Sequence, residues 1–233
     1  DAYGIYVQSP FPKENRRILI GSDVSSRYTR RNRAEYRKIA GYIARCVWQR
    51  QGNYMVFFPS YRLMEDVLQV YEEEFSVDWV RCVCQTPDMT EQEREGFLEE
   101  FQEREGTLVG FCVLGGIFSE GVDLTGESLI GAVIVGTGLP QIGSQREILK
   151  EYYDKKNHCG FDYAYRYPGM NKVLQAAGRV IRTKEDKGVI LLLDDRFWDR
   201  DYQEIFPREW QDRTGCRLDT VEGAVETFWK RFT

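Results

Sequence analysis

The sequence predicts an α/β fold in which a mostly parallel sheet is covered by helices on both sides. Segments with the pattern of strands alternate along the chain with segments of helical period, as they do in such folds. Several strand segments, among them residues 54–58 and 189–193, are apolar at consecutive positions, which is typical of strands buried on both faces. We find neither an internal repeat nor a linker, so residues 1–233 are expected to form a single domain.

The first part of the chain contains two predicted strand–helix pairs. Residues 1–16 include two prolines and are expected to lead in from a preceding domain, before a short strand at residues 17–20. Residues 32–51 carry apolar side chains at a 3.6-residue period, which predicts an amphipathic helix that a Gly-Asn pair ends. A strand at residues 54–58 and a second helix, which runs to about residue 74, complete this part.

The alternation continues through the middle of the chain. A strand is expected at residues 79–84, and Thr90 and Glu93 have the spacing of a capping box, which predicts the start of a helix. Further strands are expected at residues 107–114 and 129–135. A loop punctuated by glycines joins these two strands.

The last part combines helices with one more strand. Helices are predicted at residues 144–156 and 170–182, whereas the aromatic segment at residues 161–168 has no regular pattern. After the apolar strand that ends at Leu193, the tail of residues 200–233 is expected to be helical.

The totals describe a globular protein without the composition of a disordered chain. Hydrophobic residues make up 42% and charged residues 30%. The formal net charge is −5, so any contact with nucleic acid must come from a local basic patch. No apolar run approaches the ~20 residues that cross a bilayer, and the amino terminus has neither an initiator Met nor a signal-peptide pattern. We therefore expect a cytoplasmic fragment of a longer chain, associated with the nucleoid if the protein is bacterial.

Several familiar catalytic patterns are missing. The six cysteines are scattered and are expected to be reduced thiols without a metal. The single His158 leaves almost no basis for a Ser-His-Asp hydrolase. Asp194 and Asp195 follow an apolar strand, as Mg²⁺-binding acids do in P-loop enzymes, but the chain has no Gly-x-x-x-x-Gly-Lys-[Ser/Thr] loop for them to serve.

The predicted helix at residues 170–182 carries the clearest chemical pattern. Gln175, Arg179 and Arg182 have the spacing i, i+4 and i+7, which places them on one helix face. Guanidinium groups present rigid donor pairs that suit phosphate oxygens, so this face is a candidate for supplying charge to a nucleotide held by a neighbouring domain. A solvated basic helix face explains the segment by itself equally well.

Two further polar clusters follow predicted strands, where ligands collect in parallel sheets. Ser60 and Tyr61 have hydroxyls suited to a nucleic-acid backbone, or they are an N-cap and a packed ring. The segment Ser119-Glu-Gly-Val-Asp123 offers backbone amides and a hydroxyl to phosphates and a carboxylate to a ribose or a water, or it is an ordinary turn. We expect all three clusters to share one edge of the sheet.

Four segments resemble motifs of superfamily 2 helicases of the DinG/XPD branch, and they occur in the order of that branch. Gln175-Ala-Ala-Gly-Arg-Val-Ile-Arg182 resembles motif VI, and Ser119-Glu-Gly-Val-Asp123, followed by Gly138-Leu-Pro140, resembles motif V and its sequel. Val56-Phe-Phe-Pro-Ser-Tyr61 resembles motif IV, and Ser9-Pro-Phe11 resembles the segment between the two motor domains. The resemblance implies a RecA-like three-layer α/β/α sandwich, the second motor domain of an ATP-dependent DNA helicase.

The resemblance also implies roles for individual residues. Arg182 would be the arginine finger, Arg179 a second γ-phosphate contact and Gln175 a sensor of nucleotide state. On the nucleotide side would lie Asp123, as a coupler, with Gly121 and Gly178. The residues that would track DNA or link it to hydrolysis are Ser60, Tyr61, Ser119 and Glu120.

The resemblance finally implies partners that this chain lacks. ATP and Mg²⁺ would be held mainly by the amino-terminal motor domain of the same polypeptide, and the nucleic-acid partner would be single-stranded DNA, with no membrane involved. The P-loop, the Asp-Glu box and the four clustered cysteines of an iron–sulfur domain are absent from the sequence, so the fragment alone is expected to be inactive and to hold no iron–sulfur cluster. A non-catalytic RecA-like module that binds nucleic acid or protein remains the alternative.

Overall fold

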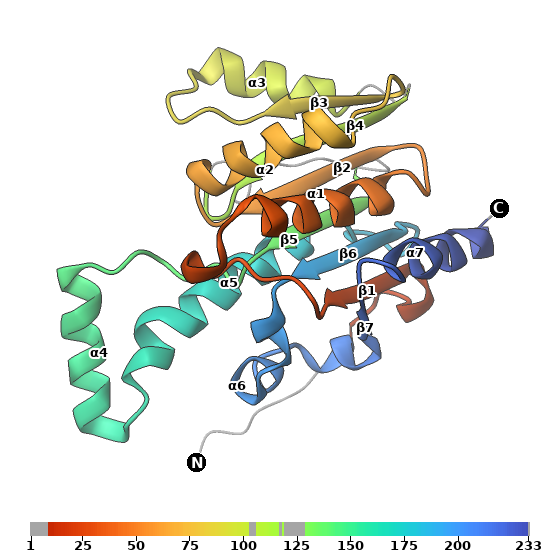
Figure 1. The fold of residues 1–233 in the computed structure, drawn as a ribbon. Coiled ribbons are helices and arrows are strands. Elements are labelled where there is room, and N and C mark those ends of the chain that lie inside the picture. Colours follow the sequence, from red (N-terminus) through yellow and green to blue (C-terminus); the bar gives the residue numbers. More distant parts are fainter. Residues whose placement is uncertain (1–8, 103–105, 117, 119–128, 233) are drawn as a thin grey trace.

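The chain folds around a parallel sheet (Figure 1). The structure is a computed structural model that describes residues 9–102, 106–116, 118 and 129–232. These residues form seven strands in the order β3-β4-β2-β5-β6-β1-β7, and every pairing between them is parallel. The strands are β1 (Arg16–Gly21), β2 (Asn53–Phe58), β3 (Val80–Cys84), β4 (Thr107–Val113), β5 (Gly131–Val135), β6 (Gly188–Leu193) and β7 (Thr214–Cys216).

Helices cover both faces of this sheet and complete a three-layer sandwich. One face packs against α1 (Arg33–Val47), α2 (Tyr61–Glu74) and α7 (Val221–Trp229). The other face packs against α3 (Glu91–Glu100), α5 (Tyr167–Ala177) and the short α6 (Arg200–Gln203). The predicted α/β class with helices on both sides is therefore confirmed.

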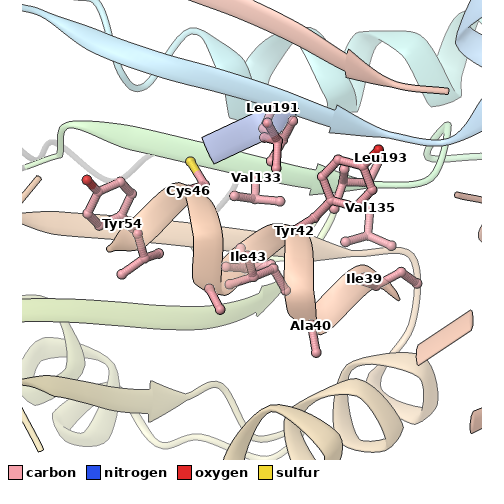
Figure 2. Close-up of a cluster of buried hydrophobic side chains, with 14 of the residues drawn as sticks. Ile39, Ala40, Tyr42, Ile43, Cys46, Tyr54, Val133, Val135, Leu191 and Leu193 are labelled. Carbon is pink, nitrogen blue, oxygen red and sulfur yellow. The ribbon is translucent and has the colours of Figure 1, made fainter. Parts of the chain in front are cut away.

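Alternate side chains of each central strand feed two separate cores. Tyr54, Val56 and Phe58 of β2 join the core under α1 and α2, whereas Met55 and Phe57 join the opposite core. Figure 2 shows the first core, in which side chains of α1 lie against those of β5 and β6. Full burial of one such side chain stabilises the fold by roughly 1.5–3 kcal/mol, which explains why the central strands are apolar at consecutive positions.

The capping signals in the sequence form as expected. The Thr90 side chain accepts a hydrogen bond from the Glu93 amide at 3.3 Å, and the Glu93 carboxylate accepts one from the Thr90 amide at 2.7 Å. This capping box starts α3. Asn32 caps α1 by one bond, because its side chain accepts a hydrogen bond from the Glu35 amide at 3.0 Å.

Helix α4 (Ser144–Asn157) differs from the other helices because it buries none of its residues. It stands apart from the sheet (Figure 1) and leads into a π-helical segment, Asp162–Arg166, that continues directly into α5. Residues 161–168, expected to be irregular, are therefore helical. Their aromatic side chains pack on one another, as in the Phe161–Tyr165 pair at 5.5 Å between ring centroids, and on α4, as in the Tyr153–Tyr163 stack at 4.0 Å. This packing does not depend on an apolar period.

Two further expectations need correction. Helix α5 ends at Ala177 and not at residue 182, because the chain must turn back to enter β6 at Gly188. The tail is helical in part, yet β7 within it extends the sheet by pairing with β1. A strand of three residues is too short to show the two-residue period of strands in the sequence. No helix among the described residues is both long and apolar enough to span a bilayer.

Candidate functional site

The arginine-bearing segment lies at the amino edge of the sheet. Helix α5 runs antiparallel to the strands it covers, so its last turn and the loop after it approach the start of β6. A Cβ at Gly188 would lie 2.1 Å from Val180, which shows how closely this loop packs on the first residue of β6. Asn15, just before β1, donates a hydrogen bond from its side-chain amide to the carbonyl of Lys184 at 2.7 Å. The expected sharing of one edge with Ser60 and Tyr61 is therefore wrong, since those residues follow the carboxyl end of β2.

Gln175, Arg179 and Arg182 do not share a helix face. Gln175 lies on α5 and is exposed, whereas Arg179 and Arg182 lie beyond the helix end. Gly178 is the C-cap, and its amide donates to the carbonyl of Leu174 at 2.9 Å. The amide of Arg179 then donates to the carbonyl of Ala176, three residues earlier, so the last turn is tighter than an α-helix and the helix ends there.

The two arginines occupy different environments. Arg179 is only 7% exposed, and the positive charge of its guanidinium acts on Cys112 of β4. Burial raises the pKa of the Cys112 thiol above its ordinary value, while Arg179 acts in the opposite direction. Arg182 is half-buried in the loop before β6. The helical spacing in the sequence could not predict these different environments, because both arginines lie beyond the end of the helix.

The loop that carries Arg182 is held by side chains of its own residues. The Asp186 carboxylate accepts hydrogen bonds from the amides of Arg182 and Thr183, each at 2.7 Å through Oδ2. The Thr183 hydroxyl accepts two more, from the amides of Glu185 and Asp186 at 3.3 Å. Residues 182–186 thus form a closed turn without helix or strand.

The segment at Ser9 and Phe11 packs beside the end of α5. Ser9 and Phe11 line a cavity of about 210 Å³ together with Gly178, Ile181 and other residues of the amino edge. Two segments far apart in the sequence, 9–11 and 178–182, are therefore neighbours. The expectation that residues 1–16 come from a preceding domain stays a prediction.

The structure places only part of the predicted motif V segment. Ser119, Glu120, Gly121 and Asp123 lie outside the described residues, so their predicted roles stay predictions. Gly138, predicted to belong to the sequel of this motif, has a φ of +67°, and a Cβ there would lie 2.6 Å from the Gly169 carbonyl. Only glycine fits this turn after β5.

Ser60 and Tyr61 have well-defined structural partners. Ser60 is the N-cap of α2, and its hydroxyl accepts a hydrogen bond from the Leu63 amide at 3.4 Å. The Tyr61 hydroxyl accepts a hydrogen bond from the Gln85 side-chain amide at 2.9 Å and donates to the Thr86 carbonyl at 3.4 Å. The N-cap expected from the sequence is confirmed, and a role in binding nucleic acid stays a prediction.

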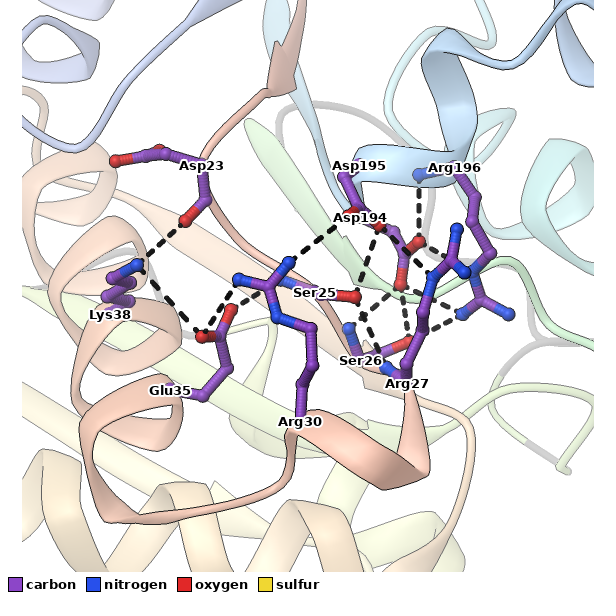
Figure 3. Close-up of polar contacts among 10 residues, drawn as sticks. All are labelled: Asp23, Ser25, Ser26, Arg27, Arg30, Glu35, Lys38, Asp194, Asp195 and Arg196. Atoms are coloured by element: carbon purple, nitrogen blue, oxygen red, sulfur yellow. Dashed lines mark hydrogen bonds and ion pairs between the residues drawn. The ribbon is translucent and has the colours of Figure 1, made fainter.

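A buried carboxylate joins the loops that follow β1 and β6 at the opposite, carboxyl edge (Figure 3). Asp194 is fully buried and accepts hydrogen bonds from the amide and the hydroxyl of Ser26, at 2.9 and 2.6 Å. Arg196 donates to it from Nε at 2.7 Å and from Nη2 at 2.9 Å. Burial alone would raise the pKa of the Asp194 carboxyl, but the bonds and positive charge of Arg196 and the bonds from Ser26 outweigh it and hold that pKa below its ordinary value.

A second group of ion pairs lies beside Asp194 (Figure 3). Asp195 pairs with Arg27 at 3.6 Å and with Arg30 at 3.2 Å. Arg30 also reaches the buried carboxylate of Glu35 at 3.4 Å. Among the residues that the structure describes, Arg31 pairs with no carboxylate, and its Nε donates instead to the Ser26 carbonyl at 3.4 Å. The edge therefore keeps an excess of positive charge.

Some of these arginines line a cleft of about 150 Å³ that crosses the carboxyl ends of four strands. The loop after β1 contributes Arg27, Tyr28 and Arg31, and the loop after β6 contributes Arg196. The remaining wall comes from the loops after β2 and β5, namely Pro59, Thr137, Gly138 and Leu139. Tyr28 is 84% exposed, and the Arg31 guanidinium lies 5.6 Å from its ring centroid. We call this feature the arginine cleft.

The arginine cleft was not predicted from the sequence, although one of its segments is visibly basic. Residues 27–33 contain four arginines in a chain of net charge −5, which is the local basic patch that nucleic-acid contact requires. The position of Arg196 in the arginine cleft could not be predicted from the sequence, because it depends on the order of the strands in the sheet. β6 lies next to β1 in the sheet but follows it by about 170 residues in the sequence.

The cysteines and acidic side chains of the described residues are dispersed. No group of three or more His, Cys, Asp or Glu side chains that could hold a metal occurs among those residues. The six cysteines are free in the structure, and Cys46, Cys112 and Cys216 are buried. Cys82 and Cys84 are half-buried, and burial raises the pKa of each thiol to about 11, which makes them poor nucleophiles.

The sheet order, the two helical layers and the polar loops at both sheet edges define a RecA-like α/β domain. Solved structures support this class. An XPD helicase structure aligns with a TM-score of 0.68 at 24% identity, over 86% of this chain and 35% of that chain. The structure of Mss116p DEAD-box helicase domain 2 bound to an RNA duplex aligns with a TM-score of 0.51 at 14% identity, over 91% of this chain and 69% of that chain.

Sequence comparison then gives the family. Residues 43–213 match the model of the helicase C-terminal domain, and the chain belongs to that family. Its relatives include a probable ATP-dependent helicase of Methanocaldococcus jannaschii, 29% identical over 84% of this chain. The ATP-dependent DNA helicase XPD of Sulfolobus acidocaldarius is 30% identical over 76% of this chain. The chain spans about a third of these relatives, 31% of the length of each.

Proposed function

We propose that this chain is the second motor domain of an ATP-dependent DNA helicase and that its two sheet edges have separate tasks. The observation that carries the proposal is the separation of its two arginine groups. The backbone of Arg179 and Arg182 lies between α5 and β6 at the amino edge, whereas the arginine cleft lies at the carboxyl edge. A nucleotide and a nucleic-acid strand could therefore be held at the same time without competing for the same side chains.

The amino edge supplies one wall of a nucleotide site. The Arg182 guanidinium would contact the γ-phosphate as the arginine finger, and Arg179 would make the second contact. Gln175, exposed on the last turn of α5, would report the nucleotide state. Bound ATP supplies the phosphoryl group that water attacks. By the resemblance of this chain's motifs to those of helicases, ATP and Mg²⁺ would be held mainly by the amino-terminal motor domain of the same polypeptide.

The carboxyl edge supplies a track for single-stranded DNA. Arg27, Arg31 and Arg196 would contact backbone phosphates, and the exposed ring of Tyr28 would stack on a base. Ser60 and Tyr61 begin the helix beside Pro59, which itself lines the cleft, so their predicted contacts would continue the same track. Such binding would be largely independent of base sequence, because phosphates and ring faces occur in every strand.

The proposal is tested by Arg182→Ala in the full-length helicase. We expect kcat for DNA-stimulated ATP hydrolysis to fall by about 10³–10⁵, the range for loss of an arginine finger, while the fold is retained. The isolated chain should neither hydrolyse ATP nor bind it tightly, because one wall of the nucleotide site is missing. Near-normal turnover in the Arg182 variant would refute the assignment and favour a non-catalytic module.

A further inference from the structure

The turn that carries Arg182 has a feature that the assignment of Arg182 does not explain. Arg182 belongs to neither α5 nor β6, so no backbone ladder fixes its position. Its amide is held instead by the Asp186 carboxylate, which also holds the Thr183 amide, through one oxygen at 2.7 Å in both cases. Both bonds are short and have an ionised acceptor, which makes them stronger than ordinary turn hydrogen bonds.

The remaining bonds of the turn make Asp186 its central residue. The Thr183 hydroxyl accepts from the amides of Glu185 and Asp186 at 3.3 Å, so it orients the residue whose carboxylate returns to Arg182. Outside the turn, Asn15 donates to the Lys184 carbonyl at 2.7 Å and ties the turn to the start of β1. Asp186 and Asn15 thus fix the position of the Arg182 backbone relative to the sheet.

We propose that Asp186 is a positioning residue, which fixes the backbone of Arg182 so that its guanidinium meets the transferred phosphoryl group. This inference rests on the proposed function of Arg182. A displacement of about 1 Å in a group that acts on the reacting atoms can cost about 10²-fold in rate. The contribution of Asp186 is therefore to turnover and not to the binding of ATP or DNA.

The test compares five variants of the full-length helicase, one of them Arg182→Ala, by steady-state ATP hydrolysis with saturating single-stranded DNA. Asp186→Ala removes the acceptor, and we expect kcat to fall by about 10²-fold with little change in the KM for ATP. Asp186→Asn keeps an oxygen acceptor without the charge and should retain most of kcat. Glu185→Ala removes an adjacent, exposed carboxylate and is the matched control, with turnover near that of the wild type.

The fourth variant is Arg182→Ala combined with Asp186→Ala, measured against Arg182→Ala alone. If Asp186 acts through Arg182, the second change should have little further effect on kcat. Hydrogen exchange should show faster exchange of the Arg182 and Thr183 amides in Asp186→Ala and near-native protection in Asp186→Asn.

The outcomes separate this inference from the proposed function. If Asp186→Ala turns over like Glu185→Ala while Arg182→Ala is impaired, the positioning role is wrong and the arginine finger stands. An equal loss from Asp186→Ala with and without Arg182 also overturns the positioning role. If Arg182→Ala itself is active, the proposed function fails and the inference fails with it. An inactive Asp186→Asn with native amide protection shows that charge and not positioning matters, and it likewise overturns the inference.

Discussion

The buried carboxylate of Asp194 holds Ser26 by both its backbone amide and its hydroxyl, at 2.9 and 2.6 Å. These two bonds join the loop after β6 to the loop after β1, and Arg196 completes the site by donating to the same carboxylate. Because Arg27 and Arg31 follow Ser26 closely in the sequence and line the arginine cleft, the shape of the cleft depends on this contact.

Asp194→Ala should strongly destabilise the domain. Removing one partner of a buried ion pair leaves the Arg196 charge and the Ser26 donors without their acceptor, which typically costs about 3–5 kcal/mol. Urea unfolding of the 233-residue chain measures the change in free energy of unfolding. Asp199→Ala is the control, since Asp199 is exposed and its side chain makes no capping hydrogen bond, and it should change stability by less than about 0.5 kcal/mol. Equal stability of the two variants would contradict the role assigned to Asp194.

The contribution of Asp194 should also depend on pH in one direction. Its pKa in the folded state is held below the ordinary value, so the folded protein favours the ionised form. The resulting stabilisation is fully present above the unfolded-state pKa of about 3.9 and is lost as the pH falls through the folded-state pKa. The difference in unfolding free energy between wild type and Asp194→Asn should therefore be constant from neutral pH down to about pH 5 and shrink at lower pH. A difference that grows on acidification would have the wrong sign.

Arg31→Ala should weaken the binding of single-stranded DNA through the loss of one phosphate contact. The slope of log Kd against log salt concentration should become shallower by about 0.7, the value for one contact on a single strand. Arg33→Ala is the matched control, because Arg33 lies at the start of α1 and pairs with Glu73 at 2.7 Å. Fluorescence anisotropy of the full-length helicase with a labelled oligonucleotide at several salt concentrations measures both. An unchanged slope for Arg31→Ala would place the DNA elsewhere.

Tyr28→Ala should lower DNA affinity without changing this salt dependence. Loss of one stacked base costs about 1–3 kcal/mol, or roughly 5–150-fold in Kd. Tyr28→Phe should bind like the wild type, because the ring and not the hydroxyl makes the contact. Tyr152→Ala removes another exposed tyrosine, 56% exposed on α4, and should have no effect. If Tyr28→Ala and Tyr152→Ala behave alike, base stacking at the cleft is ruled out.

Sequence patterns predicted most of the fold, because burial between helical layers and helix capping both depend on residues that are close in the sequence. The consecutive apolar residues of β2 and β6 are typical of strands buried on both faces, and the Thr90–Glu93 spacing located the start of α3. The patterns failed where tertiary contacts decide. The end of α5 depends on the approach of Val180 to Gly188, and β7 is a strand because β1 offers it an edge.

The sequence by itself determined the class of the domain, and it predicted which segment supplies arginines to a nucleotide. The helical period of the sequence predicted one continuous helix through Arg182, because a periodic pattern does not show where the chain must turn. Only the tertiary structure decided that Arg179 and Arg182 leave the helix at the amino edge and that Asp186 fixes the turn between them and β6. It also decided that Arg196 joins Arg27 and Arg31 at the opposite edge, because the pairing of β6 with β1 brings together loops that the sequence keeps about 170 residues apart.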